Sequence, residues 1–80
     1  MPNIACLFFN VKEGKQNQAL EELTSDEVSI YRAFCAKHQY FAIIRADTIE
    51  KVKEYIENIK AKEYVIKPVN PFIGTRAKPN

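Results

Sequence analysis

The stretch "HQYFAIIRAD", residues 38–47, contains the feature that decides the fold. A strand with one face in water alternates apolar and polar side chains. Here every residue from Tyr40 to Ile44 is apolar. We therefore expect both faces of this strand to be covered, and the question is what covers each of them.

Apolar runs and helical periodicity around this stretch predict six elements. Runs rich in Val, Ile, Phe and Tyr predict strands at 4–11, 27–36, 39–46 and 64–69. Apolar residues spaced for one helix face predict helices at 15–24 and 48–60.

A few residues indicate where these elements begin and end. Asp47 stands where the second helix needs an N-cap, and Glu50 follows three residues later, as in a capping box. Pro68 removes a backbone donor, so the last strand is expected at a sheet edge or to end there. Residues 37–39 are expected to form a tight hairpin connection.

The order of these elements predicts an α+β domain with the ferredoxin-like βαββαβ fold, an antiparallel sheet with two helices on one face. Residues 1–70 are expected to form this domain, and residues 71–80 a C-terminal arm. The first and third strands lie at the centre of the sheet in this topology. Helices then cover one face of these strands, and nothing in the chain covers the other.

A second copy of the chain is the expected cover, sheet against sheet, as in dimeric α/β barrels. Burying a large apolar side chain gains about 1.5–3 kcal/mol, so several left in water would be a substantial loss. Successive side chains of a strand point to opposite faces. The first strand therefore places either Leu7 with Phe9 or Cys6 with Phe8 on that face, and the third strand either Phe41 with Ile43 or Tyr40 with Ala42. We expect the interface at Phe9, Phe41, Ile43 and Phe72. The arm is expected to leave its own sheet and pack Phe72 on the partner subunit, or else to be a frayed terminus.

Composition narrows the class of protein. The chain has 80 residues, two cysteines and one histidine, which argues against a disulfide framework, a metal site or another cofactor. Small proteins without these additions often oligomerise, so a homodimer or a higher oligomer is expected. No signal peptide and no apolar run near the ~20 residues of a membrane span are visible, so we expect a cytoplasmic protein without a membrane partner.

Nucleic acid is not an expected partner. The net charge is only +2, and charges of both signs are interspersed over most of the chain. RNA-recognition domains share the element order, and "KHQYFAII" (37–44) has a basic residue and an aromatic in comparable places. It lacks the first aromatic residue and the glycines of that motif.

Two family resemblances meet in the second half of the chain. "RADTIEKVKEYIENIKAKEYVIKPV" (45–69) is similar to the end of short dimeric α/β-barrel proteins of an uncharacterised family. With "VKEGK" (11–15) and "DEV" (26–28), it also resembles the stand-alone ligand-binding domain of Lrp/AsnC-type regulators. The resemblance implies the ferredoxin-like fold, a dimer and a small-molecule ligand.

Charged and hydroxylated residues are the candidates for binding. Arg45, and second to it Arg32, could bind a carboxylate or phosphate through two parallel hydrogen bonds, or form structural ion pairs. Tyr31, Tyr40 and Asn10 are further ligand-binding candidates; tyrosines also commonly line the core rim, and an asparagine there commonly ends a strand. The ligand is expected in the dimer cleft near Arg45 and Tyr31.

His38, Cys6 and Cys35 carry the remaining reactive groups. His38 is either a general base or a solvated turn residue. Cys6 stands among apolar residues and indicates core packing, while Cys35 has Lys37 nearby. Three functions stay open: a ligand-binding or regulatory module, a cofactor-independent enzyme acting on a small hydrophobic substrate, and a structural or protein-interaction module.

Overall fold

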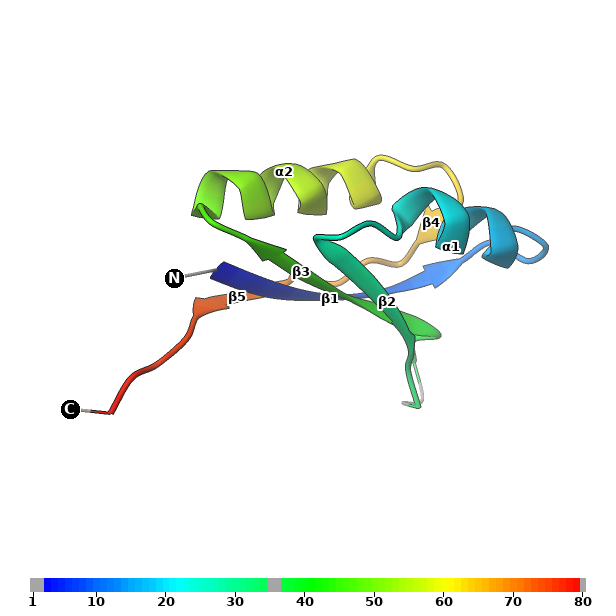
Figure 1. Ribbon diagram of the computed structural model, residues 1–80. Coiled ribbons are helices and arrows are strands. Elements are labelled where there is room, and N and C mark those ends of the chain that lie inside the picture. Colours follow the sequence, from blue (N-terminus) through cyan, green and yellow to red (C-terminus); the bar gives the residue numbers. More distant parts are fainter. Residues whose placement is uncertain (1–2, 35–36, 80) are drawn as a thin grey trace.

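The computed structural model describes residues 3–34 and 37–79, and the prediction for Cys35 lies outside them. The elements in chain order are β1 (Asn3–Val11), α1 (Gln16–Leu23), β2 (Val28–Arg32), β3 (Tyr40–Ala46), α2 (Ile49–Lys60), β4 (Val65–Ile66) and β5 (Phe72–Thr75). Figure 1 shows both helices on one side of the sheet.

The sheet confirms the predicted α+β fold. Its strand order is β2-β3-β1-β4, with β5 also beside β1, and every pairing is antiparallel. β1 and β3 lie at the centre, in a register that places Phe9 opposite Tyr40 and Ala5 opposite Ile44. This is the ferredoxin-like βαββαβ arrangement.

The core forms between the sheet and the helices, and it shows which alternate residues face each way. The helix side of the two central strands holds Ala5, Leu7, Phe9, Val11, Tyr40, Ala42 and Ile44, all of them buried. Val52, Ile56 and Ile59 of α2 pack against them. Phe41 and Ile43 therefore point to the opposite face, as predicted. The interface prediction for Phe9 is wrong, because Phe9 is 1% exposed in the core, and Phe8 lies on the other face in its place.

α2 begins one residue later than predicted. Its N-cap is Thr48, whose Oγ1 accepts a hydrogen bond of 3.1 Å from the Lys51 N–H. The prediction of Asp47 as N-cap is therefore wrong. Thr48 has the extended backbone of an N-cap (φ −126°, ψ 153°). The Asp47 carbonyl instead accepts a 3.0 Å hydrogen bond from the Asn3 side chain, which joins the start of the helix to the start of β1.

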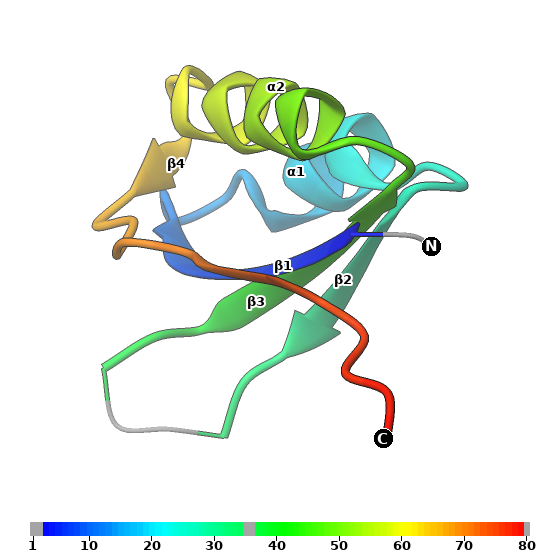
Figure 2. The same cartoon turned by 90° about the vertical axis from the view of Figure 1, so that its left-hand side faces the viewer.

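The last strand is shorter than predicted, and the tail returns to the sheet. β4 ends at Ile66, because Lys67 has a left-handed backbone (φ 52°) and Pro68 has no N–H. The Val69 N–H then donates to the Phe8 carbonyl at 3.1 Å. β5 continues along the same edge of β1, pairing Phe72 with Cys6 and Thr75 with Asn3. Figure 2 shows this run beside β1. The prediction that the arm leaves its own sheet is therefore wrong.

The β2–β3 connection is longer than the predicted tight turn at 37–39. β2 ends at Arg32 and β3 begins at Tyr40. One further hydrogen bond, from the Ala33 N–H to the Gln39 carbonyl at 2.8 Å, extends the ladder beyond the strand ends. The described parts of the connection, residues 33–34 and 37–39, therefore lie beyond the strand ends.

Candidate functional site

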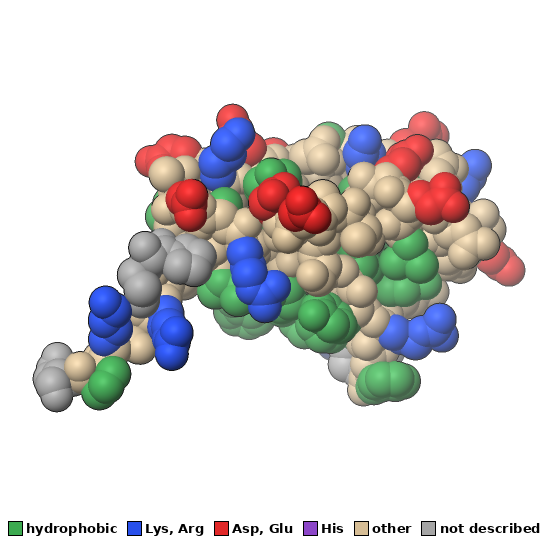
Figure 3. Space-filling model, viewed as in Figure 1, with side chains coloured by type: hydrophobic (Ala, Val, Ile, Leu, Met, Phe, Trp, Pro, Cys, Tyr) green, Lys and Arg blue, Asp and Glu red, His purple; other side chains and the backbone are tan. Residues whose placement is uncertain are grey.

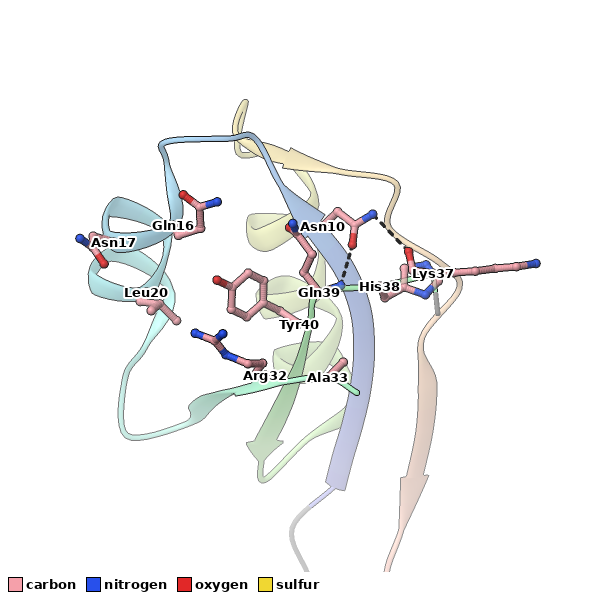
Figure 4. Close-up of a pocket in the computed structure, with 10 residues that line it drawn as sticks. All are labelled: Asn10, Gln16, Asn17, Leu20, Arg32, Ala33, Lys37, His38, Gln39 and Tyr40. Atoms are coloured by element: carbon pink, nitrogen blue, oxygen red, sulfur yellow. Dashed lines mark hydrogen bonds between the residues drawn. The ribbon is translucent and has the colours of Figure 1, made fainter. Parts of the chain in front are cut away.

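A cavity of about 700 Å³ lies between α1 and the end of the β2–β3 hairpin. Its lining comes from α1, the end of β1 and the hairpin: Asn10, Gln16, Asn17, Leu20, Arg32, Ala33, Lys37, His38, Gln39 and Tyr40. Four of the candidate residues named from the sequence, Asn10, Arg32, His38 and Tyr40, are among them. Figure 4 shows the arrangement.

Arg32 and Tyr40 carry the polar groups that face α1. They are cross-strand neighbours, so their side chains leave the sheet on the same face, the one under the helices. The Tyr40 ring is held by Phe9, with ring centroids 6.0 Å apart. Figure 4 shows the Arg32 guanidinium and the Tyr40 hydroxyl both directed toward the α1 side of the cavity. The Tyr40 hydroxyl and the Arg32 guanidinium therefore line the same part of the cavity.

The cavity favours a negatively charged group. None of its ten lining residues is acidic, and Arg32 and Lys37 are cationic. Within residues 3–34 and 37–79, the Arg32 side chain is in neither an ion pair nor a side-chain hydrogen bond. Its five N–H donors are therefore available to a ligand, and their planar geometry matches a carboxylate.

Asn10 holds the hairpin end in place. Its Nδ2 donates to the Lys37 carbonyl at 3.3 Å, and its Oδ1 accepts from the Gln39 N–H at 2.7 Å. The Val11 N–H donates to Gln39 Oε1 at 3.0 Å. β1 and β3 separate at this point, and these side-chain bonds replace the missing backbone ladder. Asn10, predicted to bind ligand, shapes the cavity wall through these bonds.

His38 and Lys37 are directed differently from Arg32. The His38 ring lies against Phe8, with centroids 5.8 Å apart, and Phe8 belongs to the helix-free side of the sheet. Figure 4 shows the Lys37 side chain extending away from Arg32 and Tyr40. The role of His38 as a base stays a prediction.

The four predicted ligand-binding residues do not converge. Arg45 is five residues beyond Tyr40 on β3, a separation of roughly 17 Å along a strand. It lines a second cavity of about 400 Å³, together with Glu27, Ala46, Asp47, Lys51 and Tyr55. Tyr31 lies on the helix-free side and stacks on Phe41 at 5.2 Å. The binding roles of Arg45 and Tyr31 stay predictions, and neither residue lines the larger cavity.

Sequence reasoning missed the α1 side of the cavity. Gln16, Asn17 and Leu20 belong to α1, which the apolar spacing predicted as a helix but not as part of a site. Ala19 and Leu23 are buried, while Leu20 is 37% exposed. Leu20 belongs to the same apolar stripe as Ala19 and Leu23 in the sequence, so no sequence signal distinguished it.

The helix-free face is the second notable surface. We use this name for Ile4, Cys6, Phe8, Tyr31, Phe41, Ile43 and Phe72. Phe8 and Tyr31 flank Phe41, at centroid distances of 5.4 and 5.2 Å. Tyr31 is 46% exposed and Phe72 71%. Figure 3 shows apolar side chains gathered beneath the sheet and acidic ones on the helix side. The predicted apolar surface is therefore present.

Cys6 is half-buried on this face and forms no disulfide. Burial raises the pKa of its thiol, which lowers the thiolate fraction and hence its reactivity. Within the described residues no group of His, Cys, Asp or Glu could hold a metal ion. No described helix is long and apolar enough to cross a membrane.

Tyr64 connects α1 to the turn before β4. Its hydroxyl donates a 2.8 Å hydrogen bond to Glu22 of α1. Burial, and then this hydrogen bond, raises the pKa of Tyr64 to about 12. The same bond lowers the pKa of the exposed Glu22 carboxyl. The contact fixes one end of α1, and α1 forms one wall of the cavity.

The Tyr64 hydroxyl is expected to make stability fall at high pH. Because its folded-state pKa is raised, this contribution is fully present below pH 10 and is lost as the pH rises toward about 12. Tyr64→Phe should remove that part of the decline. Urea unfolding of both proteins at about pH 9 and about pH 11.5 measures it. Tyr31→Phe is the matched control on the other face, and an identical pH dependence for wild type and Tyr64→Phe would refute the assignment.

Comparison with known proteins places the fold among solved structures. No protein-family model and no curated protein matches the sequence. Among the solved structures that match are TTHA0845 from Thermus thermophilus (TM-score 0.76, 16% identity, 98% of this chain and 99% of that chain); FFRP-DM1 (0.76, 18%, 91% and 99%); and MtbAldR (0.74, 11%, 96% and 54%). The chain shares their fold. It spans nearly all of TTHA0845 and FFRP-DM1, but about half of MtbAldR.

Proposed function

We propose that this chain is a small regulatory ligand-binding module, that it acts as a homodimer, and that it holds a small carboxylate in the cavity beside α1. The sequence resemblance to the ligand-binding domain of Lrp/AsnC-type regulators supports this proposal. The ferredoxin-like fold that the resemblance implies is the observed one. The chemistry of the cavity then suggests the ligand class.

The convergence of Arg32 and Tyr40 is the observation that carries the proposal. In a cavity without acidic lining, the guanidinium can donate two parallel hydrogen bonds to a carboxylate. The Tyr40 hydroxyl can donate a third. Hydrogen bonds to a charged group are worth about 1.5–3 kcal/mol, so Arg32 is expected to dominate the affinity.

The α1 wall suggests what the carboxylate is attached to. Leu20 offers exposed apolar surface, and Ala33 lines the opposite side of the cavity. Gln16 and Asn17 add side-chain amides near the first turn of the helix. A carboxylate with a small apolar group fits this lining, because the charged end meets Arg32 and the apolar end meets Leu20.

Arg32→Gln is expected to weaken carboxylate binding by roughly tenfold to a hundredfold, as the loss of a charged hydrogen-bonding pair predicts. Calorimetric titration with benzoate and isovalerate, and native mass spectrometry of the purified protein, measure it. Arg45→Gln is the matched control, since Arg45 lines the other cavity. Equal weakening by both variants, greater weakening by Arg45→Gln, or no carboxylate binding by the wild type would contradict the proposal.

We propose a second copy as the cover of the helix-free face. Cys6, Phe8, Phe41 and Ile43 form an uncharged strip across the two central strands. In a chain of 80 residues, the core beneath the helices alone provides a thin margin of stability. Two such faces packed together bury their apolar surfaces at once.

A further inference from the structure

β5 leaves one backbone edge open. Residues Phe72–Thr75 pair with Asn3–Cys6 of β1 on one side. In the part of the chain that the structure describes, β5 pairs with no other strand, and its backbone groups take part in none of the turn and loop hydrogen bonds. An open edge of this kind presents N–H and C=O groups to which an extended peptide can add as a further strand.

The charge around this edge is of one sign. The segment after Glu63 contains Lys67, Arg76 and Lys78 and no acidic residue. All three cations are exposed, and none is in an ion pair among residues 3–34 and 37–79. Proteins protect open edges by placing charges within the strand. Here β5 itself is uncharged, and the cations lie before and after it.

We infer that the β5 edge binds an extended acidic segment of another protein, which joins the sheet as an additional strand. The backbone of β5 would supply the ladder hydrogen bonds, and Arg76 and Lys78 would attract the acidic side chains. Phe72 and Ile73 are exposed on opposite faces of the strand, so each can contact alternate side chains of the added strand.

Two other occupants fit this edge less well. A second copy that paired through its own β5 would bring the same cations rather than acidic groups, because the chain has no acidic residue after Glu63. A single-stranded nucleic acid would use stacked rings, and Phe8, Tyr31 and Phe41 lie on the sheet face rather than at this edge. The edge is also separate from the cavity beside α1, whose lining includes no residue of β5.

Fluorescence anisotropy with a labelled peptide of about ten alternating Glu and Val residues tests the inference. We expect binding that weakens as salt increases. Two control peptides should bind at least about tenfold more weakly: one with Lys in place of Glu, and one N-methylated at alternate residues, which cannot form the ladder. Amide chemical shifts should change at residues 72–75 and 3–6.

Paired variants of the chain complete the test. Arg76→Glu with Lys78→Glu should weaken peptide binding at least about tenfold. Lys53→Glu with Lys60→Glu makes the same charge change on α2 and should leave binding unchanged. Four results would each overturn the inference: no binding, equal loss in both double variants, shift changes confined to residues 28–32 or to residues 8, 41 and 43, and tighter binding of an oligothymidylate of similar length.

Discussion

Phe41→Lys is expected to convert the proposed homodimer into single chains. Phe41 lies between Phe8 and Tyr31 at the middle of the helix-free face. A two-fold interface repeats the substitution, so two apolar rings are lost and two charges are placed in apolar surroundings. Each ring is worth about 1.5–3 kcal/mol, and each unpaired ion costs several more. The dissociation constant should rise by about a thousandfold or more.

Sedimentation velocity across a series of protein concentrations measures this effect. Asn58→Lys is the control, because it adds the same charge at an exposed position of α2 and should leave the dimer intact. Circular dichroism should show that Phe41→Lys stays folded, since the Phe41 ring lies outside the core beneath the helices. A wild type that is already a single chain at micromolar concentration would refute the sheet-face dimer.

Ile44→Ala is expected to reduce the free energy of unfolding by about 2–5 kcal/mol, the cost of a large core truncation. Ile44 is fully buried between the sheet and the helices. At roughly 0.05–0.15 kcal/mol per residue, a chain of 80 residues has about 4–12 kcal/mol of stability in all, so this loss is a large share of it. The variant should therefore unfold at a clearly lower urea concentration than the wild type, as urea titration can measure.

The neighbouring residue supplies a matched control. Ile43→Ala removes the same atoms from the same strand, but on the helix-free face. Both substitutions are best made in the Phe41→Lys background, where dimer formation no longer contributes to stability. Ile43→Ala should then cost clearly less than Ile44→Ala. Equal costs would mean that the two faces of β3 are equally packed in the single chain.

Most of the fold follows from local sequence patterns. The spacing of Ile49, Val52, Ile56 and Ile59 predicted α2, because helical periodicity is a strong signal over a dozen residues. The element order then left the ferredoxin-like sheet as the natural topology. The candidate site was predictable only in part: Tyr40, Asn10 and, second to Arg45, Arg32 were identified as candidates, but Arg45 and Tyr31 do not line the same cavity.

The tail shows why strand pairing is hard to predict from a short stretch. Pro68 predicted an edge strand or a strand end, because a missing N–H is a local property, and β4 lies at the sheet edge and ends two residues before it. The return of Phe72–Thr75 to β1 depends on backbone hydrogen bonds with residues almost seventy positions away. No pattern within "NPFIGTRAKPN" (70–80) indicates such a pairing.

The sequence by itself determined the elements, their order and the presence of an apolar surface beyond what two helices can cover. Periodicity, turn chemistry and composition are local, and they act before the chain has folded. Only the tertiary structure decided that Phe9 packs under the helices while Phe8 lies opposite, and that Arg32 meets Tyr40 beside α1. In an unbroken apolar run, the odd-numbered and the even-numbered side chains are equally hydrophobic. Which of the two sets faces the helices therefore depends only on the strand register and on where the helices pack.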